Sequence, residues 1–132
     1  MGDKYERALV AGIVASDLVL PNGLVGRQRT VRISLDVIAH IAQRHEDDII
    51  CCLHHTAEVL ANPQFLGHHQ RADPRRVEFV RVVGERRHLV SVAVKFLDEH
   101  NEAWVSTIHL SNERHLTRRW RDGTMEKVDR GP

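Results

Sequence analysis

Residues 77–96 read VEFVRVVGERRHLVSVAVKF, two valine-rich runs separated by the polar segment Gly84-Glu85-Arg86-Arg87. Alternating and β-branched residues favour strands, and a glycine followed by charged residues is typical of a tight turn. The stretch is therefore predicted to form a β-hairpin, with strands over 77–83 and 89–96. Because its two strands are joined locally, the sheet that is built around them is predicted to be antiparallel.

Further segments extend the predicted sheet in both directions. A third strand is predicted over 104–110, and the alternating residues 30–33 predict a short strand before the hairpin. Residues 64–70 are predicted to form a short edge strand. Residues 7–20 are mostly apolar and precede the turn-forming triplet Pro21-Asn22-Gly23, which predicts a strand, a turn and a second strand.

Two helices are predicted ahead of the hairpin and one after it. Ser34 is a good N-cap for a helix over 35–46, in which apolar residues recur at helical spacing. A second helix is predicted over 49–60, and Pro63 stops it. Beyond the third strand, residues 111–121 are predicted to form a closing helix that is rich in arginine.

Together these elements predict an α+β domain, in which N-terminal helices pack on one face of an antiparallel sheet of about four strands. The chain of 132 residues has the length of one domain, which is expected over residues 1–120, with residues 1–30 unassigned. Residues 121–132 carry no apolar pattern and are predicted to be a loose tail.

Composition and charge exclude several classes of protein. The 19 basic and 18 acidic residues give a net charge of +1, which argues against a general nucleic-acid coat. No apolar run reaches the roughly 20 residues that a membrane-spanning helix needs, and the N-terminus lacks the basic segment of a secretory signal. Cys51 and Cys52 are adjacent and form no disulfide framework. A cytoplasmic protein without membrane contact is expected.

The ten histidines do not have the spacing of a metal site. There is no His-Glu-x-x-His motif, and His54-His55 and His68-His69 are adjacent pairs whose side chains point apart. The glycines are scattered, so no phosphate-binding loop is indicated, and no Gly-x-Ser-x-Gly nucleophile motif occurs. The sequence therefore predicts no metal and no other cofactor.

A metal-free set of histidine, lysine, arginine and hydroxyl side chains remains. His45 falls on the apolar side of the first helix, which is expected to meet the sheet, whereas His40 falls on the polar side. Lys95 is expected opposite about residue 105 of the next strand, so Thr107 is its diagonal neighbour and shares a face with Val105. Such a set suits cleavage of RNA, which carries its own nucleophile in the 2′-hydroxyl.

Three of these residues also have purely structural interpretations, which stay open. A histidine at position 45 fits the core, if its ring nitrogens find partners. Lys95 fits a strand end whose charge reaches solvent, and Thr107 fits a bond to neighbouring backbone.

A resemblance to a known family is carried by residues in both halves of the chain. In the first half they are Ile33-Ser34, His40-Ile41-x-x-Arg44-His45 and Leu60-x-x-Pro63. In the second half they are Val80-Arg81, Leu89-Val90-x-Val92-x-Val94-Lys95 and Trp104-Val105-Ser106-Thr107-Ile108. In this order, over about residues 30–120, they resemble the phage-type nucleases of the barnase–EndoU–colicin–RelE superfamily.

The resemblance implies a metal-independent endoribonuclease that cleaves RNA through attack by the 2′-hydroxyl. Such proteins often act as toxins or are encoded in phage-derived genes. Matched residue by residue, the resemblance implies catalytic roles for His40, His45, Lys95 and Thr107, and a looser match for Arg81. RNA is the implied substrate, and an immunity or antitoxin protein is the implied partner.

Two alternatives of other classes stay open. The same fold can serve as a non-catalytic RNA- or protein-binding domain, or as a phage structural protein of particle assembly. Convergence of His45, Lys95 and Thr107 in one cleft favours the enzyme. Where many relatives have an aromatic residue after the threonine, this chain has Ile108-His109, so His109 is either a substitute acid or an ordinary strand residue. The sequence does not determine the oligomeric state.

The arginines of the closing helix are candidates for contact with the RNA backbone. Arg114 and Arg118 are four residues apart and so share one side of a helix, and Arg119 and Arg121 follow. These residues are predicted to form a basic edge that binds substrate. The alternative is a solvated helix surface with no ligand.

Overall fold

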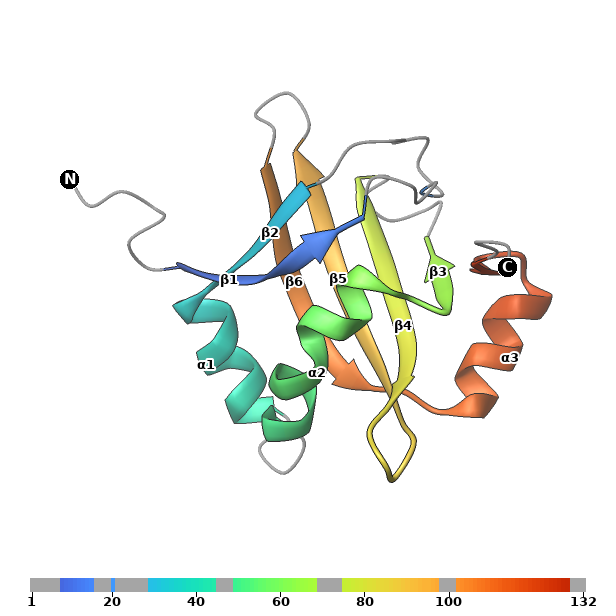
Figure 1. The fold of residues 1–132 in the computed structure, drawn as a ribbon. Helices are drawn as coiled ribbons and strands as arrows, with labels where there is room; N and C mark the ends of the chain where they lie inside the picture. The colour runs from blue at the N-terminus through green and yellow to red at the C-terminus, as the bar shows by residue number, and fades with distance from the viewer. Residues whose placement is uncertain are drawn as a thin grey trace.

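The computed structural model describes residues 8–15, 20, 29–44, 49–68, 75–97 and 102–128. These residues form three helices and a mixed seven-stranded sheet (Figure 1). The prediction of a mixed helix-and-strand domain is confirmed, but the predicted sheet of about four strands is too small. The seven strands include one at Ala8–Val14, within the strand predicted in residues 7–20, and one at Met125–Lys127, which was not predicted.

The sheet is built around the predicted hairpin. Its strands, in spatial order, are β1 (Ala8–Val14), β2 (Arg29–Ser34), β6 (Glu102–Leu110), β5 (His88–Leu97), β4 (Arg76–Val83), β3 (Phe65–Gly67) and β7 (Met125–Lys127). Neighbouring strands are antiparallel except β2 and β6, which run parallel. β3 therefore lies inside the sheet rather than at its edge, and β7 occupies part of the predicted loose tail.

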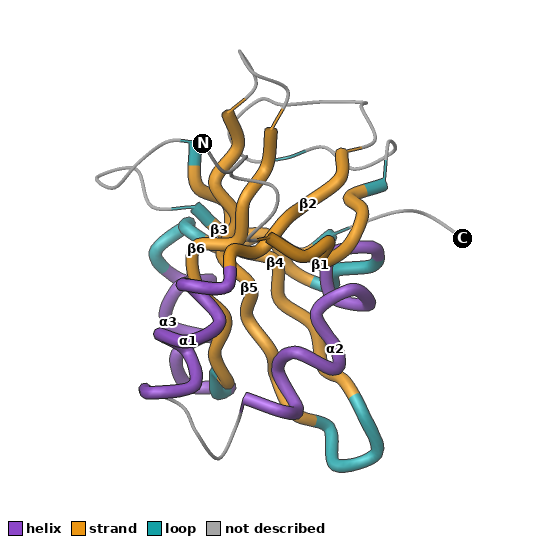
Figure 2. The backbone as a smooth tube through the Cα atoms, turned by 90° about the vertical axis from the view of Figure 1, so that its left-hand side faces the viewer, coloured by secondary structure: helices purple, strands orange, loops and turns teal. Residues whose placement is uncertain are grey.

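Two helices cover one face of the sheet, which we call the inner face. In α1 (Leu35–Arg44), the Ser34 hydroxyl accepts a 3.1 Å hydrogen bond from the Val37 amide, which confirms the predicted N-cap. α2 (Ile49–Ala61) packs against β1, β4, β5 and β6 (Figures 1 and 2). No helix in the described ranges is both long and apolar enough to cross a membrane.

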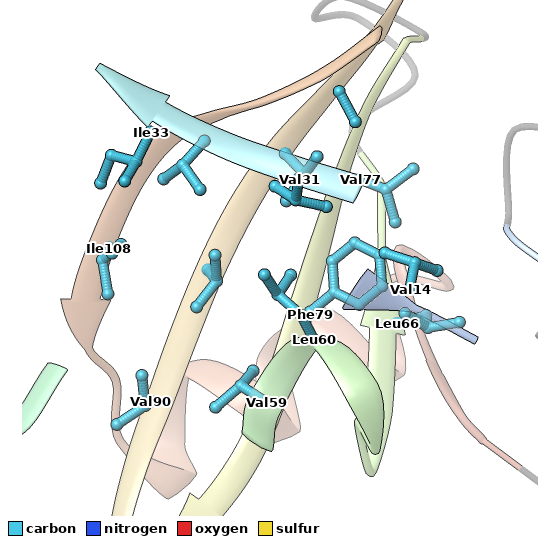
Figure 3. Close-up of a cluster of buried hydrophobic side chains, with 14 of the residues drawn as sticks. Val14, Val31, Ile33, Val59, Leu60, Leu66, Val77, Phe79, Val90 and Ile108 are labelled. Atoms are coloured by element: carbon cyan, nitrogen blue, oxygen red, sulfur yellow. The ribbon is translucent and has the colours of Figure 1, made fainter. Parts of the chain in front are cut away.

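The main hydrophobic core lies between this inner face and the two helices. Strand β5 contributes alternate valines and a phenylalanine, and Phe79 of β4 lies 6.3 Å from Phe96, measured between ring centroids. Val31 of β2, Leu60 of α2 and Ile108 of β6 fill the same volume from other elements (Figure 3). The two-residue period of the strands thus directs one set of side chains into hydrocarbon.

The third helix packs on the opposite, outer face of the sheet. α3 (Glu113–Arg121) begins at Asn112, whose side chain accepts a 2.8 Å hydrogen bond from the His115 amide. Its Leu116 packs in a second small core with Val80, Leu89 and Met125. The two N-terminal helices α1 and α2 therefore lie on one face, as predicted, and α3 lies on the opposite face.

Candidate functional site

A β-bulge at Ser106 determines which residues share a face with Lys95. Ala93 pairs with Thr107 and Val94 pairs with Val105, so Ser106 is the extra residue on β6. Lys95 is therefore opposite Trp104, one residue from the predicted position at about residue 105. Val105 turns into the core, whereas Thr107 points to the outer face, so the prediction that these two residues share a face is wrong.

Lys95 and Thr107 nevertheless lie on the same face of the sheet. Thr107 is directly opposite Ala93, which is two residues from Lys95 and on the same side of β5. The two side chains are diagonal neighbours, as predicted from the alternation of the strands. Both are half-buried. A cation and a hydroxyl thus stand within reach of one small group on the outer face.

Three cationic side chains and one indole lie in register across four strands of this face. Arg76 of β4 is opposite Lys95 of β5, Lys95 is opposite Trp104 of β6, and Trp104 pairs with Arg32 of β2. All four are half-buried. We call Arg76, Lys95, Trp104 and Arg32 the cationic row. Trp104 is oriented by its indole nitrogen, which donates a 3.0 Å hydrogen bond to Glu102.

Small and polar side chains continue the outer face next to the cationic row. Ala93 lies between Glu78 and Thr107, and Ser91 is opposite His109. The Ser91 hydroxyl is 3.4 Å from a Glu78 carboxylate oxygen, to which it donates a hydrogen bond. The register thereby places His109 on the same face as Lys95 and Thr107.

Arg119 has a structural position, which corrects its prediction as an RNA-binding residue of an exposed edge. Its side chain is 4% exposed, and its Nη1 atom lies 2.6 Å from Glu78 Oε2. Nη2 donates to the carbonyl oxygens of His68 and Thr124 at 3.2 and 3.1 Å. Arg119 therefore attaches α3 to the sheet and has no surface left for a ligand.

Arg81 is on the inner face, away from Lys95 and Thr107. Its Nε atom is 3.3 Å from Glu58 Oε1, and its Nη1 atom donates a 2.9 Å hydrogen bond to the Asn62 carbonyl oxygen. Both partners lie at the C-terminal end of α2, where a cation is favoured by the helix dipole. The predicted catalytic residue Arg81 thus holds the end of a helix in this structure.

The predicted helix histidines are not gathered with the outer-face residues. His40 is exposed on α1, and α1 packs on the inner face against β2 and β6. The sheet therefore separates His40 from Lys95 and Thr107. His45 lies outside the described residues, so its predicted position at the centre of the site stays a prediction.

Arg114 and Arg118 share one exposed side of α3, as predicted from their spacing. Together with Thr117, Arg121 and Glu113 they line an open depression of about 520 Å³. Arg118 Nη2 is also 3.2 Å from Nδ1 of His115. Unlike Arg119, these two arginines present their guanidinium groups to solvent, so they keep the capacity to bind phosphate.

Sequence reasoning missed several residues of the outer face. Arg32 alternates with the buried Val31 and Ile33, a pattern that places it on the outer side of β2. Arg76 and Glu78 likewise alternate with Val77 and Phe79. The register that aligns them with Lys95 depends on strand pairing, which local patterns do not contain. Within the described ranges, no three histidine, cysteine or carboxylate side chains come together to hold a metal ion.

Comparison of the chain with protein-family models, with curated proteins and with solved structures finds no match. The resemblance to the nuclease superfamily therefore stays a prediction from the sequence.

Proposed function

We propose that this protein is a metal-independent endoribonuclease that binds single-stranded RNA on the outer face of its sheet. The observation that supports the proposal is the cationic row, which crosses four strands on the same face as Thr107 and His109. Neighbouring strands are about 4.8 Å apart, so the row spans roughly 14 Å, which exceeds one phosphodiester unit. Its cations suit phosphates, and Trp104 offers a ring for stacking a base.

Three residues have separate roles in the proposed reaction. His109 accepts the proton of the 2′-hydroxyl, and the 2′-oxygen attacks phosphorus. Lys95 and Thr107 bind the non-bridging oxygens, whose negative charge increases in the transition state. The bond from phosphorus to the 5′-oxygen breaks, and water protonates that oxygen. The products carry a 2′,3′-cyclic phosphate and a 5′-hydroxyl.

The first experiment incubates the purified protein with transfer RNA and messenger RNA in EDTA, and maps the product ends. Cleavage that leaves cyclic phosphates is expected. Activity that requires added zinc or manganese would contradict the proposed mechanism. In Lys95→Ala, turnover should fall on the order of a hundredfold while the KM changes little, because the lost charge acts mainly in the transition state.

Histidine variants test where the site lies. His109→Gln should lose cleavage, whereas His54→Gln, an exposed change on α2, should keep it. His40→Gln separates the outer face from the residue set implied by the family resemblance. If His40→Gln is inactive and His109→Gln is fully active, the catalytic site is not on the outer face.

A non-catalytic RNA-binding domain is the second candidate function. It is favoured by one observation: on the described strands, His109 is the single histidine that the register places on the outer face. Transesterification is most efficient with both a base and an acid. RNA binding without cleavage, lost in Arg32→Gln/Arg76→Gln, would establish this second function instead of the first.

A further inference from the structure

The two edges of the sheet differ in length and charge. β7 has three residues, of which Glu126 and Lys127 are charged and exposed. β1 has seven residues, ALVAGIV, and none is charged. Within the described ranges, β1 pairs with β2 on one side and with no strand on the other. Proteins usually protect a long edge strand with charges, proline or a covering element, because its free amides and carbonyls bind another strand.

The side chains of β1 add an apolar surface to this open edge. Leu9, Val10 and Ile13 are 55%, 64% and 44% exposed. Beneath them is an apolar pocket of about 190 Å³ between β1, β2, α1, α2 and β6, and its exposed lining residues are Leu9, Val10 and Leu53. We call β1 together with Leu53 the β1 edge. Among the described residues, it combines a strand edge that pairs with no further strand with exposed hydrocarbon, as sites of strand addition do.

β1 packs closely against the rest of the domain. Gly12 of β1 passes so close to α2 that a Cβ atom there would lie 3.0 Å from Leu60 Cδ1 and 3.1 Å from Ala57 Cα. Val14, at the end of the strand, is fully buried in the main core. β1 and α2 lie side by side in both views (Figures 1 and 2). A strand that is already ordered loses little conformational entropy when a partner binds.

We propose that the β1 edge binds the β1 edge of a second copy of this chain, in an antiparallel two-fold pair that joins two sheets. The composition of β1 supports this occupant. A charged strand would bring its charges against the exposed apolar side chains Leu9, Val10 and Ile13, whereas β1 is uncharged along its whole length. Antiparallel pairing of identical strands also satisfies two-fold symmetry, in which the same patch serves both partners.

The size of the contact determines its expected strength. Seven residues span roughly 24 Å, so the interface lies at the small end of specific interfaces. Dimerisation is therefore expected in the micromolar range rather than at nanomolar concentration. This inference does not rest on the proposed ribonuclease activity. The β1 edge and the cationic row are tested by different measurements.

Sedimentation equilibrium over low to high micromolar concentrations of the full chain tests the proposal. The wild type should pass from the 15.1 kDa monomer to a species of twice that mass. Val10→Lys places a charge on the exposed edge and should weaken dimerisation at least about tenfold. Trp120→Lys, a matched change of an exposed apolar residue on α3, should leave dimerisation unchanged.

Hydrogen exchange locates the interface. Amides of residues 8–14 should become more protected as the protein concentration rises, and this change should be absent in Val10→Lys. Circular dichroism confirms that both variants are folded. A wild-type protein that stays monomeric at high micromolar concentration would overturn the proposal. Equal weakening of dimerisation by Val10→Lys and Trp120→Lys would also overturn the proposal. So would a dimer in which the amides of residues 8–14 gain no protection.

Discussion

The two faces of β5 bury their side chains by different means. On the inner face, Val90, Val92 and Val94 are surrounded by hydrocarbon from α2 and the neighbouring strands. On the outer face, Ser91 is equally buried, yet it lies next to the ion pair between Glu78 and Arg119. An antiparallel sheet often leaves its outer face to water. Here part of the outer face is instead a packed polar layer.

This difference has an energetic consequence. Apolar burial stabilises the folded protein in proportion to the buried area. Removing atoms from side chains of the inner face therefore lowers the stability of the protein gradually. A buried ion pair stabilises weakly as a whole, but loss of one partner leaves a buried charge without compensation. The inner face is therefore expected to tolerate changes of shape, and the outer face to depend on matched partners.

The largest expected effect is on the inner face. Phe79→Ala removes a fully buried ring that packs against Phe96, and should lower the free energy of unfolding by about 3–5 kcal/mol. Urea denaturation followed by circular dichroism measures this. Phe79→Leu keeps most of the side-chain volume and should lower the free energy of unfolding by much less. Equal losses in the two variants would show that the inner face does not respond to volume.

The ion pair tests the outer face. Arg119→Met should lower the free energy of unfolding by about 3 kcal/mol, because the largely buried Glu78 carboxylate loses its ion-pair partner Arg119. Arg118→Met, a change of the exposed neighbour on α3, should alter stability by less than about 0.5 kcal/mol. Adding Glu78→Leu to Arg119→Met should recover most of the loss. If the double variant is less stable than Arg119→Met, the proposed dependence on matched partners is wrong.

A smaller effect is expected where the outer face is proposed to bind RNA. Thr107→Val keeps the shape of the side chain but removes the hydroxyl, and should lower the rate of RNA cleavage about tenfold. Thr107→Ser keeps a hydroxyl and should retain most of the activity. The two rates, measured at saturating RNA, separate hydrogen bonding from packing. Similar cleavage rates for Thr107→Val and Thr107→Ser would show that Thr107 contributes through packing and not through its hydroxyl.

The smallest effect concerns the exposed arginines of α3. Arg114→Gln/Arg118→Gln should reduce the salt dependence of RNA binding by about one to two in the slope of log K against log salt. Fluorescence anisotropy across a salt series measures the slope. Arg86→Gln/Arg87→Gln, in the exposed turn between β4 and β5, serves as the matched control. An unchanged slope in the α3 variant would show that the depression on α3 is a solvated surface that does not bind RNA.

Local sequence patterns determined most elements of this protein. The hairpin over 77–96, the cap at Ser34 and the helix that ends near Ala61 depend on neighbouring residues, and the structure confirms them. Alternation along β4 likewise places Arg81 on the same face as Phe79. These features follow from side-chain period and turn chemistry, which act over a few residues.

Tertiary structure decided the face, the register and the partners. Because of the bulge at Ser106, Trp104 rather than Val105 shares a face with Thr107. Nothing in the local alternation reveals the inserted residue. Met125–Lys127 becomes a strand because β3 offers an open edge to pair with. Arg119 is buried because Glu78, distant in sequence, lies beneath it. Each of these depends on contacts between remote segments, whose energies exist only once the chain has folded.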